Sequence, residues 1–553
     1  MKKFLSIFLS ICMVLCMMTG CGGTTGAPAA ETTTPAPTVD TSAAKAAEST
    51  VISGEVEAID NTTVEARDVL RIGEFQEEWE GTDLVQCDSF YDLQMMTAEP
   101  LFLYNHDTGE LEACLAEAPT FSEDGKTMTF NIPEGLKFAN GAELGADDVV
   151  ASLQHGIDAG VMNDTFAIIQ SMSYEGNTVT LNLESYSTAL LILLVSPFFC
   201  VIDTEQLETL STEDLRWNAT PYGAYYVSNY VEGGGVTLTR NDNFKTLNNT
   251  VENKEACYIP TIEVTWYEDE FAMIAAYEAG ELDFLIGVTE DSVATLKDMD
   301  DTVISSSLPP MVRNVQLNPN RGAFMDKNVR TAVSFLIDRA VIVEGFGGDL
   351  MCSPQYEYIT ENVMYRTPEV ETWYKDTYSD DVEKGLALLE EAGWTDSDGD
   401  GILDKDGKAM DTLIFNTASG KNETAALAIQ MTLQAYGFPV EVVTTTETTE
   451  LAKAGEYDMT MCNYWWSEPG RYLVNMYKDH NAFDETEYTA LVKKVETGLD
   501  NEQRFADVEA AQRMIMEEMT VIPLYTTSYV KIYKKDLANI HFIVDGMFLN
   551  DIK

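Results

Sequence analysis

The most apolar segment in the body of this 553-residue chain is Ala189–Ile202. A transmembrane helix needs about 20 predominantly apolar residues, and this segment is shorter and contains Ser196-Pro197. It is therefore predicted to be a buried helix or strand, and no other segment of the body approaches a membrane span. With 45% hydrophobic residues the chain can bury sizeable cores, and its length predicts two or three lobes.

The first twenty residues have the organisation of an export signal. Lys2 and Lys3 precede an apolar run from Phe4 to Met17 that only two serines interrupt. A basic n-region followed by a short apolar region is typical of a secretory signal peptide. We therefore predict a signal peptide over residues 1–20.

The segment Met18-Thr19-Gly20-Cys21 follows this run. It is similar to the lipobox of bacterial lipoproteins, in which the cysteine thiol receives a diacylglyceryl group and becomes the mature N-terminus, although Met18 stands where leucine is more usual. Two acyl chains would supply the two membrane signals that stable anchoring requires. We predict lipidation of Cys21; the alternative is an ordinary signal peptide that contains this cysteine by chance.

Residues 21–63 are predicted to be the lipidated N-terminus and a flexible linker. From Gly22 to about Ser53 the chain is rich in Gly, Thr, Ala, Pro and Glu and has no aromatic residue. Such a segment buries too little apolar surface to offset the entropy of ordering it. The first strand of the folded body is predicted at Val69–Gly73.

Charge and cysteine spacing exclude several kinds of partner. The net charge of −58 repels nucleic acids and anionic lipid headgroups, so neither is a predicted partner. The body has six cysteines without a CxxC or zinc spacing: Cys87, Cys114, Cys200, Cys257, Cys352 and Cys462. We expect them to be mostly buried free thiols.

A series of short motifs runs through the body. The first are Leu111–Glu117, the turn Ser122-Glu123-Asp124-Gly125, the alternating strand Thr127–Ile132, Gly135–Gly141 and Ala146–Ser152. A hairpin over Thr220–Val227 and Val236–Asn241 follows, then a helix from Ala272 that Gly280 terminates and a strand over Leu282–Ile286. Next comes Asn328–Arg339. Apolar residues at 329, 332, 333, 336, 337 and 340 have the spacing of an amphipathic helix. The last motif is Val382–Trp394.

In this order the motifs resemble family 5 of the extracellular solute-binding proteins of ABC transporters, the group that takes dipeptides, oligopeptides and nickel. The resemblance spans about residues 68–540. Two departures are Ala118-Pro119, where a tryptophan is common, and Ala139-Asn140, where the family has His or Asp before the glycine.

The resemblance implies an α/β fold of the two-lobed periplasmic-binding-protein type. Each lobe has a mixed sheet flanked by helices, a hinge joins the lobes, and an extra subdomain is inserted in lobe I. Lobe I is then built from residues 64–89, 219–308 and 524–553, the inserted subdomain from 90–218, and lobe II from 309–523.

The segment Tyr457–Tyr472 resembles the part of the family that crosses the cleft between the lobes. In oligopeptide binders an aspartate three residues before Glu-Pro neutralises the peptide α-ammonium, whereas this chain has Trp465 there. A buried ammonium without a carboxylate partner loses several kcal/mol. Adjacent indoles instead offer flat faces for sugar rings, aromatic side chains or a cation, or they pack the lobe interface.

Candidate ligand-binding residues follow from this segment and from the resemblance. Arg471 would pair with a ligand carboxylate or form a surface salt bridge. The whole set comprises Tyr464, Trp465, Trp466, Arg471 and Asn463, with Trp217, Asn314 and Gln316 as weaker candidates.

An acidic stretch fits the first nine positions of a calcium loop. Its oxygens at positions 1, 3, 5, 7 and 9 belong to Asp396, Asp398, Asp400, the carbonyl of Ile402 and Asp404, with Gly401 at the sharp turn. Position 12, normally glutamate, is Gly407. The stretch is either a calcium site or a solvated Asp/Gly turn; no other cofactor is expected.

Enzyme signatures are missing from the sequence. Its four histidines, His106, His155, His480 and His541, lie far apart, and there is no HExxH, GxSxG or P-loop. We therefore predict that the protein is not an enzyme.

The resemblance predicts a monomeric, lipid-anchored substrate-binding component of an ABC importer outside the cytoplasm. It would capture a solute between the lobes and deliver it to permease subunits in the membrane. A peptide or peptide-like solute ranks first, an oligosaccharide stacked on tryptophan second, and nickel last because histidine is scarce. From another class, the alternatives are a secreted surface enzyme or a calcium-dependent adhesin.

Overall fold

The structure is a computed structural model that describes residues 50–51, 65–75, 79–87, 93–160, 162–196, 199–465, 467–478, 485–537, 539–543 and 546–553. All of these belong to one unit of the chain, Ala43–Lys553. The predicted signal peptide, Cys21 and the predicted linker apart from Thr50 and Val51 lie outside the described residues, as do Trp466 and His480.

Eight strands form the first sheet in the order β1-β13-β22-β12-β2-β11-β10-β9. They are β1 (Thr50–Val51), β2 (Val69–Phe75), β9 (Tyr225–Val231), β10 (Gly235–Arg240), β11 (Thr261–Tyr267), β12 (Phe284–Ile286), β13 (Thr302–Ser307) and β22 (Tyr529–Lys534). The central strand β2 runs parallel to β11 and β12, and the other pairs are antiparallel, so the sheet is mixed. A Cβ at Gly73 would lie 2.6 Å from Cδ1 of Leu282, so glycine permits the close packing on this face of β2.

Two residues of the predicted linker form a strand. Thr50 and Val51 pair with Ser306 and Ser305 at the edge of the eight-stranded sheet. Both residues are β-branched, which favours a strand once an edge is available for pairing. These two residues thus belong to the sheet, while the linker over residues 21–63 as a whole stays a prediction.

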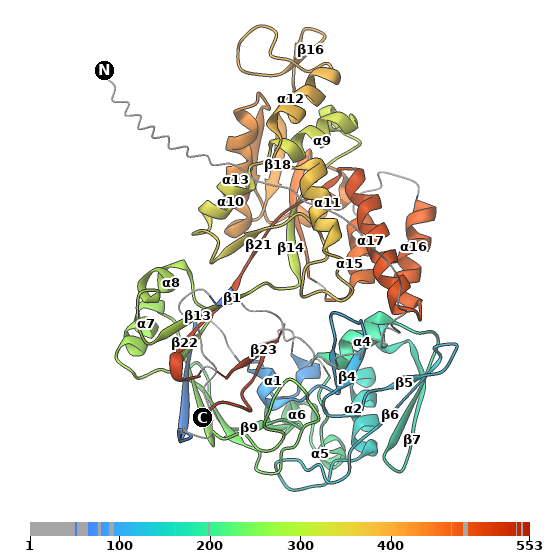
Figure 1. The fold of residues 1–553 in the computed structure, drawn as a ribbon, viewed down its shortest axis with the longest axis vertical. Coiled ribbons are helices and arrows are strands. Elements are labelled where there is room, and N and C mark those ends of the chain that lie inside the picture. Colours follow the sequence, from blue (N-terminus) through green and yellow to red (C-terminus); the bar gives the residue numbers. More distant parts are fainter. Residues whose placement is uncertain are drawn as a thin grey trace, which may run out of the picture. The chain divides into compact units, whose positions relative to one another are not determined.

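Six strands form the second sheet in the order β15-β21-β14-β20-β18-β19. They are β14 (Met311–Leu317), β15 (Cys352–Pro354), β18 (Leu413–Thr417), β19 (Val440–Thr444), β20 (Met459–Trp465) and β21 (Val521–Thr527). Helices α9 (Lys327–Leu336), α10 (Arg339–Gly345), α12 (Val382–Glu391) and α13 (Lys421–Gln434) share its apolar core. Figure 1 shows α9, α10 and α13 beside β14 and β18.

The amphipathic helix predicted around residues 329–340 is two helices. α9 ends at Leu336, and Asp338 starts α10 by accepting hydrogen bonds from the backbone nitrogens of Ala340 (2.9 Å) and Val341 (3.4 Å). Aspartate is a strong N-cap, and its side chain therefore interrupts an apolar pattern that is otherwise continuous.

A four-stranded antiparallel sheet contains β5 (Thr120–Phe121), β6 (Thr127–Asn131), β8 (Thr178–Leu183) and β7 (Ile169–Glu175) in that order. Its residues Met128, Phe130 and Val179 belong to the same apolar core as Leu70 and Ile72 of β2. The two-stranded sheets are β3 (Phe102–Tyr104) with β4 (Leu111–Ala113), β16 (Asp404–Lys405) with β17 (Lys408–Ala409), and β23 (His541–Ile543) with β24 (Gly546–Phe548).

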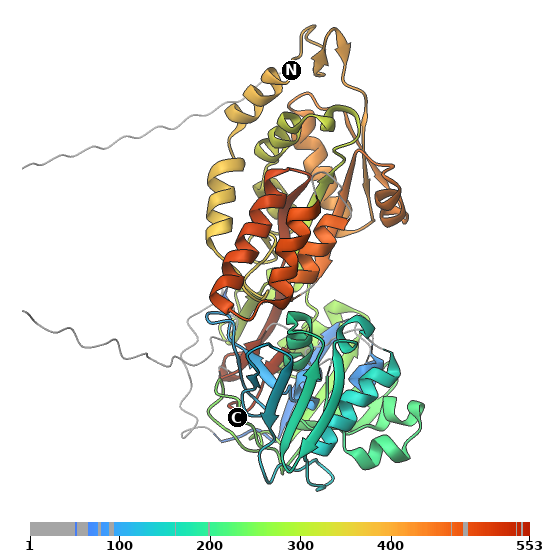
Figure 2. The ribbon, with the colours of Figure 1, turned by 90° about the vertical axis from the view of Figure 1, so that its right-hand side faces the viewer.

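Three C-terminal helices pack side by side: α15 (Pro469–Lys478), α16 (Glu485–Thr497) and α17 (Asn501–Glu517) (Figure 2). Helix α4 (Thr188–Val195) packs against α15 and α16, and its leucines are buried. The first part of the apolar run, from Ala189 to Val195, is therefore a buried helix, in line with the prediction of a buried helix or strand. Within the described residues, no helix combines the length and the apolar composition needed to cross a membrane.

The remaining helices lie between these elements in the chain. They are α1 (Gln94–Thr97), α2 (Ala146–Ala159), α3 (Asn163–Phe166), α5 (Thr204–Thr209), α6 (Thr212–Asn218), α7 (Glu270–Glu278), α8 (Glu290–Leu296), α11 (Glu369–Tyr378) and α14 (Thr448–Ala454), with 3-10 turns η1 (Leu84–Gln86), η2 (Gly322–Met325) and η3 (Lys535–Leu537).

Candidate functional site

Strand β20, which lies between β14 and β18 in the six-stranded sheet, carries the first part of the predicted ligand-binding segment. It pairs antiparallel with β14, which places Asn463 opposite Arg313. The Asn463 side chain is exposed, and its Nδ2 donates to Sδ of Met311 at 3.5 Å. The side chains of Tyr464 and Trp465, like the whole of Trp466, lie outside the described part of the chain.

Asn314 and Gln316 lie on the neighbouring strand β14 and are closed off from solvent. Asn314 is 0% exposed and Gln316 1% exposed. Nδ2 of Asn314 donates to the carbonyl of Val312 at 2.9 Å, and Nε2 of Gln316 donates to the hydroxyl of Tyr457 at 2.6 Å. In this structure both amides bond to groups of the protein, and their contact with a ligand stays a prediction.

The Glu-Pro step after β20 contains a fully buried carboxylate. Glu468 accepts hydrogen bonds from the backbone nitrogens of Gly470 and Arg471, both at 2.7 Å, and from Oγ1 of Thr188 at 2.5 Å. Burial raises the pKa of Glu468 above its ordinary value, against the effect of these hydrogen bonds. The carboxylate therefore caps the start of α15 and ties it to α4.

Arg471 makes a second contact of the same kind. One of its guanidinium nitrogens donates to Oγ1 of Thr165 in α3 at 2.6 Å. Thr165 and Thr188 both belong to the segment 90–218, whereas Glu468 and Arg471 follow β20. The first turn of α15 is thus joined to α3 and α4 by two hydrogen bonds between side chains.

Trp217 lies in a different place, on α6, where it lines a pocket of about 1430 Å³. Trp79, Tyr230 and Trp266 line the same pocket, and we call it the tryptophan pocket. The ring centroids of Trp217 and Tyr230 are 5.2 Å apart, and those of Tyr230 and Trp266 are 5.9 Å apart. Three aromatic rings from α6, β9 and β11 therefore contact one another in a row, the first pair tilted by 34° and the second edge-to-face at 62°.

Carboxylates hold two of these indoles by their N–H edges. Nε1 of Trp217 donates to Glu213 at 3.1 Å, and Nε1 of Trp266 donates to Glu74 at 2.9 Å. Glu74 is 2% exposed and stands beside Trp266 in the parallel register of β2 and β11. The ring positions are therefore fixed before any ligand arrives.

Trp217 was predicted from the sequence as a ligand-binding residue, whereas Trp79, Tyr230 and Trp266 were not. The signal that would have found Trp266 is its position near the carboxyl end of a parallel strand, where ligand sites commonly lie in α/β sheets. The predicted hairpin would have placed Tyr230 at the edge of the sheet, because β9 is the edge strand next to β10.

The acidic loop brings together three of its four predicted carboxylates. Oxygens of Asp396, Asp398 and Asp404 all lie within 4.8 Å of one another. Backbone nitrogens already donate to these groups: Gly399 and Gly401 to Asp396, and Ser397 to Asp404. Both interpretations, a calcium site and a solvated turn, fit this geometry, because oxygens that share one calcium ion lie at most about 5.2 Å apart.

The thiols and imidazoles of the described residues form no reactive cluster. Each of the six body cysteines is a thiol rather than half of a disulfide, and five of them are buried, as expected. Burial raises the pKa of Cys257 and Cys352 to about 12, which keeps them in the unreactive thiol form. His155 pairs with Asp83 and His541 with Asp551, in separate parts of the fold.

Comparisons with known proteins agree with this architecture. The family model for bacterial extracellular solute-binding proteins, family 5, matches residues 110–484. The chain is 25% identical over 434 residues to the oligopeptide-binding protein AppA of Bacillus subtilis (strain 168), covering 74% of this chain and 77% of that protein. It is 22% identical over 480 residues to the nickel-binding periplasmic protein of Escherichia coli (strain K12), covering 81% and 87%.

Solved structures show the same fold. NikA from Brucella suis in complex with Fe(III)-EDTA superposes with a TM-score of 0.72 at 22% identity, covering 88% of this chain and 99% of that one. A peptide-binding protein AppA from Clostridium difficile gives 0.69 at 18% identity, covering 87% and 99%. The fold is thus the α/β two-lobed fold of the periplasmic solute-binding proteins. By the extent of the family match, this chain belongs to family 5 of the bacterial extracellular solute-binding proteins.

Proposed function

We propose that this protein is the lipid-anchored solute-binding component of an ABC importer, and that it delivers its solute to a permease in the membrane. The observation that carries the proposal is the family match over residues 110–484. The relatives are named as oligopeptide-binding and nickel-binding proteins, and none of those compared is named as an enzyme.

Capture works by closure of two lobes around the solute, with lobe I and its inserted subdomain on one side and lobe II on the other. A ligand favours the closed form only by the contacts that this form adds. The hydrogen bonds that Arg471 donates to Thr165 and that Thr188 donates to Glu468 join these two sides. They are therefore contacts that a closing movement makes or breaks.

Two solute classes fit the proposed role. A peptide or peptide-like solute is favoured by the names of the relatives. An oligosaccharide is favoured by Trp465 at the position of the ammonium-binding aspartate and by the tryptophan pocket. Nickel has less support, because the described histidines lie in separate parts of the fold.

The test is a thermal-shift screen of the full chain in detergent against tetrapeptides and tetrasaccharides. A solute at 100-fold excess over its dissociation constant stabilises the folded form by about 2.7 kcal/mol. We expect one class to raise the melting temperature and to be recovered chemically unchanged. Conversion of the solute would support the surface-enzyme alternative, and stabilisation by calcium with no response to any solute would support the adhesin.

The anchor is tested separately in cells. We expect the wild-type protein and a Cys16→Ala variant, whose substitution lies in the signal, to sediment with membranes and to incorporate labelled fatty acid. Cys21→Ala should do neither. Retention of Cys21→Ala in the membrane fraction would contradict lipidation at this cysteine.

A further inference from the structure

The tryptophan pocket has the composition of a site for a particular chemical class. Its aromatic row, Trp217, Tyr230 and Trp266, offers flat apolar surface that remains partly exposed, since Tyr230 is 37% exposed and both indoles are half-buried. The indole N–H groups of Trp217 and Trp266 already donate to Glu213 and Glu74. The N–H edges of these two indoles are therefore already occupied, and only the exposed parts of the ring surfaces remain for a ligand.

Planar polar side chains surround this row. Asn218, Asn229 and Glu232 are exposed at the pocket lining, and Glu80 and Arg216 complete it. Such groups both donate and accept hydrogen bonds, so they match vicinal hydroxyls that do the same. Aromatic faces with amide and carboxyl groups at their edges thus complement a ring that is apolar on its C–H face and polar at its rim.

The charge of the pocket lining disfavours an anionic ligand. The two carboxylates of Glu80 and Glu232 oppose one guanidinium, that of Arg216, so the lining is net negative. Nε of Arg216 donates to the carbonyl of Glu80 at 2.9 Å, and its Cζ lies 5.4 Å from the ring centre of Trp217. A cation already occupies that position next to the indole, which leaves a neutral ligand as the better match.

Size favours a ligand of more than one ring. Pockets of roughly 300–1,000 Å³ hold ligands of drug size, and this pocket of about 1430 Å³ is larger. We infer that the tryptophan pocket binds a neutral oligosaccharide, with sugar rings stacked on the row of Trp217, Tyr230 and Trp266 and hydroxyls bound by the planar side chains around it. The inference rests on the proposed function, and it places the saccharide contacts on the side of lobe I, since every lining residue lies between Trp79 and Trp266.

The experiment is calorimetric titration of the full chain in detergent with cellotetraose, maltotetraose, N-acetylated chitotetraose, tetra-alanine and tetralysine. We expect at least one of the neutral tetrasaccharides to bind. Trp217→Ala should weaken that binding about tenfold, and Trp217→Phe, which keeps a ring, should weaken it less.

Trp373→Ala is the matched control, because Trp373 is also half-buried with an arginine, Arg513, 4.4 Å from its ring centre, yet it does not line the pocket. It should leave the affinity unchanged. Unchanged melting temperatures without solute establish that the variants fold, and Trp266→Phe provides an independent test of the same row.

The outcomes separate the inference from the proposed function. Saccharide binding that Trp217→Ala and Trp266→Phe leave unchanged overturns the assignment of the pocket. Binding of a peptide and of no saccharide also overturns it, while the role as an import component stands. If neither class binds, the assignment of the pocket falls, and nickel is then the remaining solute of the import component.

Discussion

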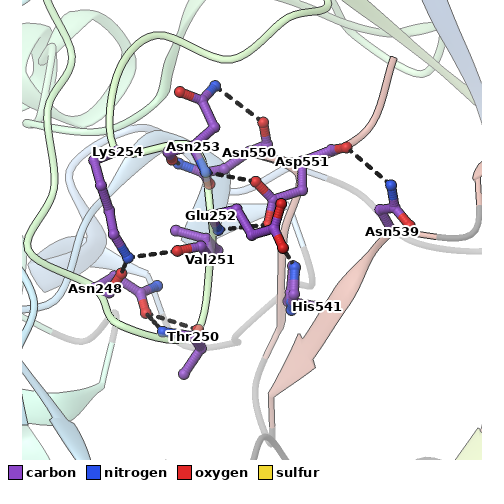
Figure 3. A network of polar contacts seen from close by, with 10 residues as sticks. All are labelled: Asn248, Thr250, Val251, Glu252, Asn253, Lys254, Asn539, His541, Asn550 and Asp551. Atoms are coloured by element: carbon purple, nitrogen blue, oxygen red, sulfur yellow. Dashed lines mark hydrogen bonds and ion pairs between the residues drawn. The ribbon is translucent and has the colours of Figure 1, made fainter. Parts of the chain in front are cut away.

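Nε2 of His541 lies 2.7 Å from Oδ2 of Asp551, close to the C-terminus (Figure 3). The same carboxylate accepts hydrogen bonds from the backbone nitrogens of Glu252 at 2.8 Å and Asn253 at 2.7 Å. The side chains of Asn253 and Asn550 each donate to the backbone carbonyl of the other residue. One buried carboxylate therefore fastens the last residues to a loop about 300 positions earlier in the chain.

The first prediction concerns acid sensitivity at Asp551. Burial acts to raise its pKa, but the hydrogen bonds from His541, Asn253 and Glu252 outweigh burial and hold the pKa below the ordinary 3.8. Because the folded protein holds the ionised carboxylate more firmly than the unfolded chain does, this carboxylate stabilises the fold at pH values above the unfolded-state pKa. The contribution is lost as the pH falls through the folded-state pKa. We expect Asp551→Asn to reduce the free energy of unfolding by about 1–3 kcal/mol at pH 7, and the difference from wild type to shrink below pH 3.8.

Urea denaturation at pH 7 and at several values below pH 4 measures this difference. Asp411→Asn is the matched control, since the Asp411 side chain is 82% exposed and pairs only with the exposed Lys408. It should change the stability little at any pH. If the difference in the free energy of unfolding between wild type and Asp551→Asn stays constant as the pH falls below 3.8, the role assigned to this carboxylate is contradicted.

The second prediction concerns the bond between Thr188 and Glu468. Thr188→Val keeps the shape of the side chain but removes the hydroxyl that donates to the buried carboxylate at 2.5 Å. We expect a loss of about 1–3 kcal/mol in the free energy of unfolding, because Glu468 is then left with two backbone donors. Thr295→Val serves as the control, since that hydroxyl donates to the carbonyl of Asp291 on an exposed helix surface. Equal midpoints for the two variants in urea would rule out a special contribution from Thr188.

Local elements were predictable wherever one short signal determined them. The turn at Ser122–Gly125 joins β5 and β6 as expected, and Asp124 accepts from the Lys126 nitrogen at 3.1 Å. Gly280 ends the α7 region with φ at +74°, a conformation that glycine adopts without strain. Neither element needs a distant partner to form.

Sites assembled from distant segments were not predictable in the same way. Trp266 meets Glu74 because β11 and β2 pair in parallel, and nothing in either local sequence indicates that register. Asn314 and Gln316 are polar residues that suggested ligand contact, yet their strand is covered on both faces. Burial of this kind depends on which elements pack above a strand, and tertiary packing alone determines that.

The third prediction concerns the acidic loop. Because backbone nitrogens already satisfy Asp396 and Asp404, we expect the fold to survive EDTA. If the loop holds calcium, the added ion should raise the melting temperature, and Asp398→Asn should abolish that rise, because one of the three clustered carboxylates is lost. Asp406→Asn, outside the cluster, is the control. A melting temperature that does not respond to calcium would leave the solvated turn as the correct interpretation.

The fourth prediction concerns the buried carboxyl group of Glu99, which affects stability near neutral pH. Burial raises the pKa of Glu99 to about 7, against the effect of hydrogen bonds from Thr246 (2.5 Å) and Cys114 (3.1 Å). Because the folded protein favours the neutral carboxyl group, Glu99 contributes its full stability below the unfolded-state pKa of 4.5. This contribution is lost as the pH rises through the folded-state pKa of about 7. The loss amounts to about 3 kcal/mol once the group is fully ionised.

Glu99→Gln removes this titration, because the amide stays neutral at every pH. We expect the variant to be no more stable than wild type at pH 5, but to gain on it by about 3 kcal/mol between pH 5 and pH 8. Glu123→Gln, at an exposed glutamate, should show no such gain. Urea midpoints for the three proteins at both pH values decide the matter: a wild-type to Glu99→Gln difference that is the same at pH 5 and pH 8 would mean that Glu99 is already ionised in the folded protein at pH 5.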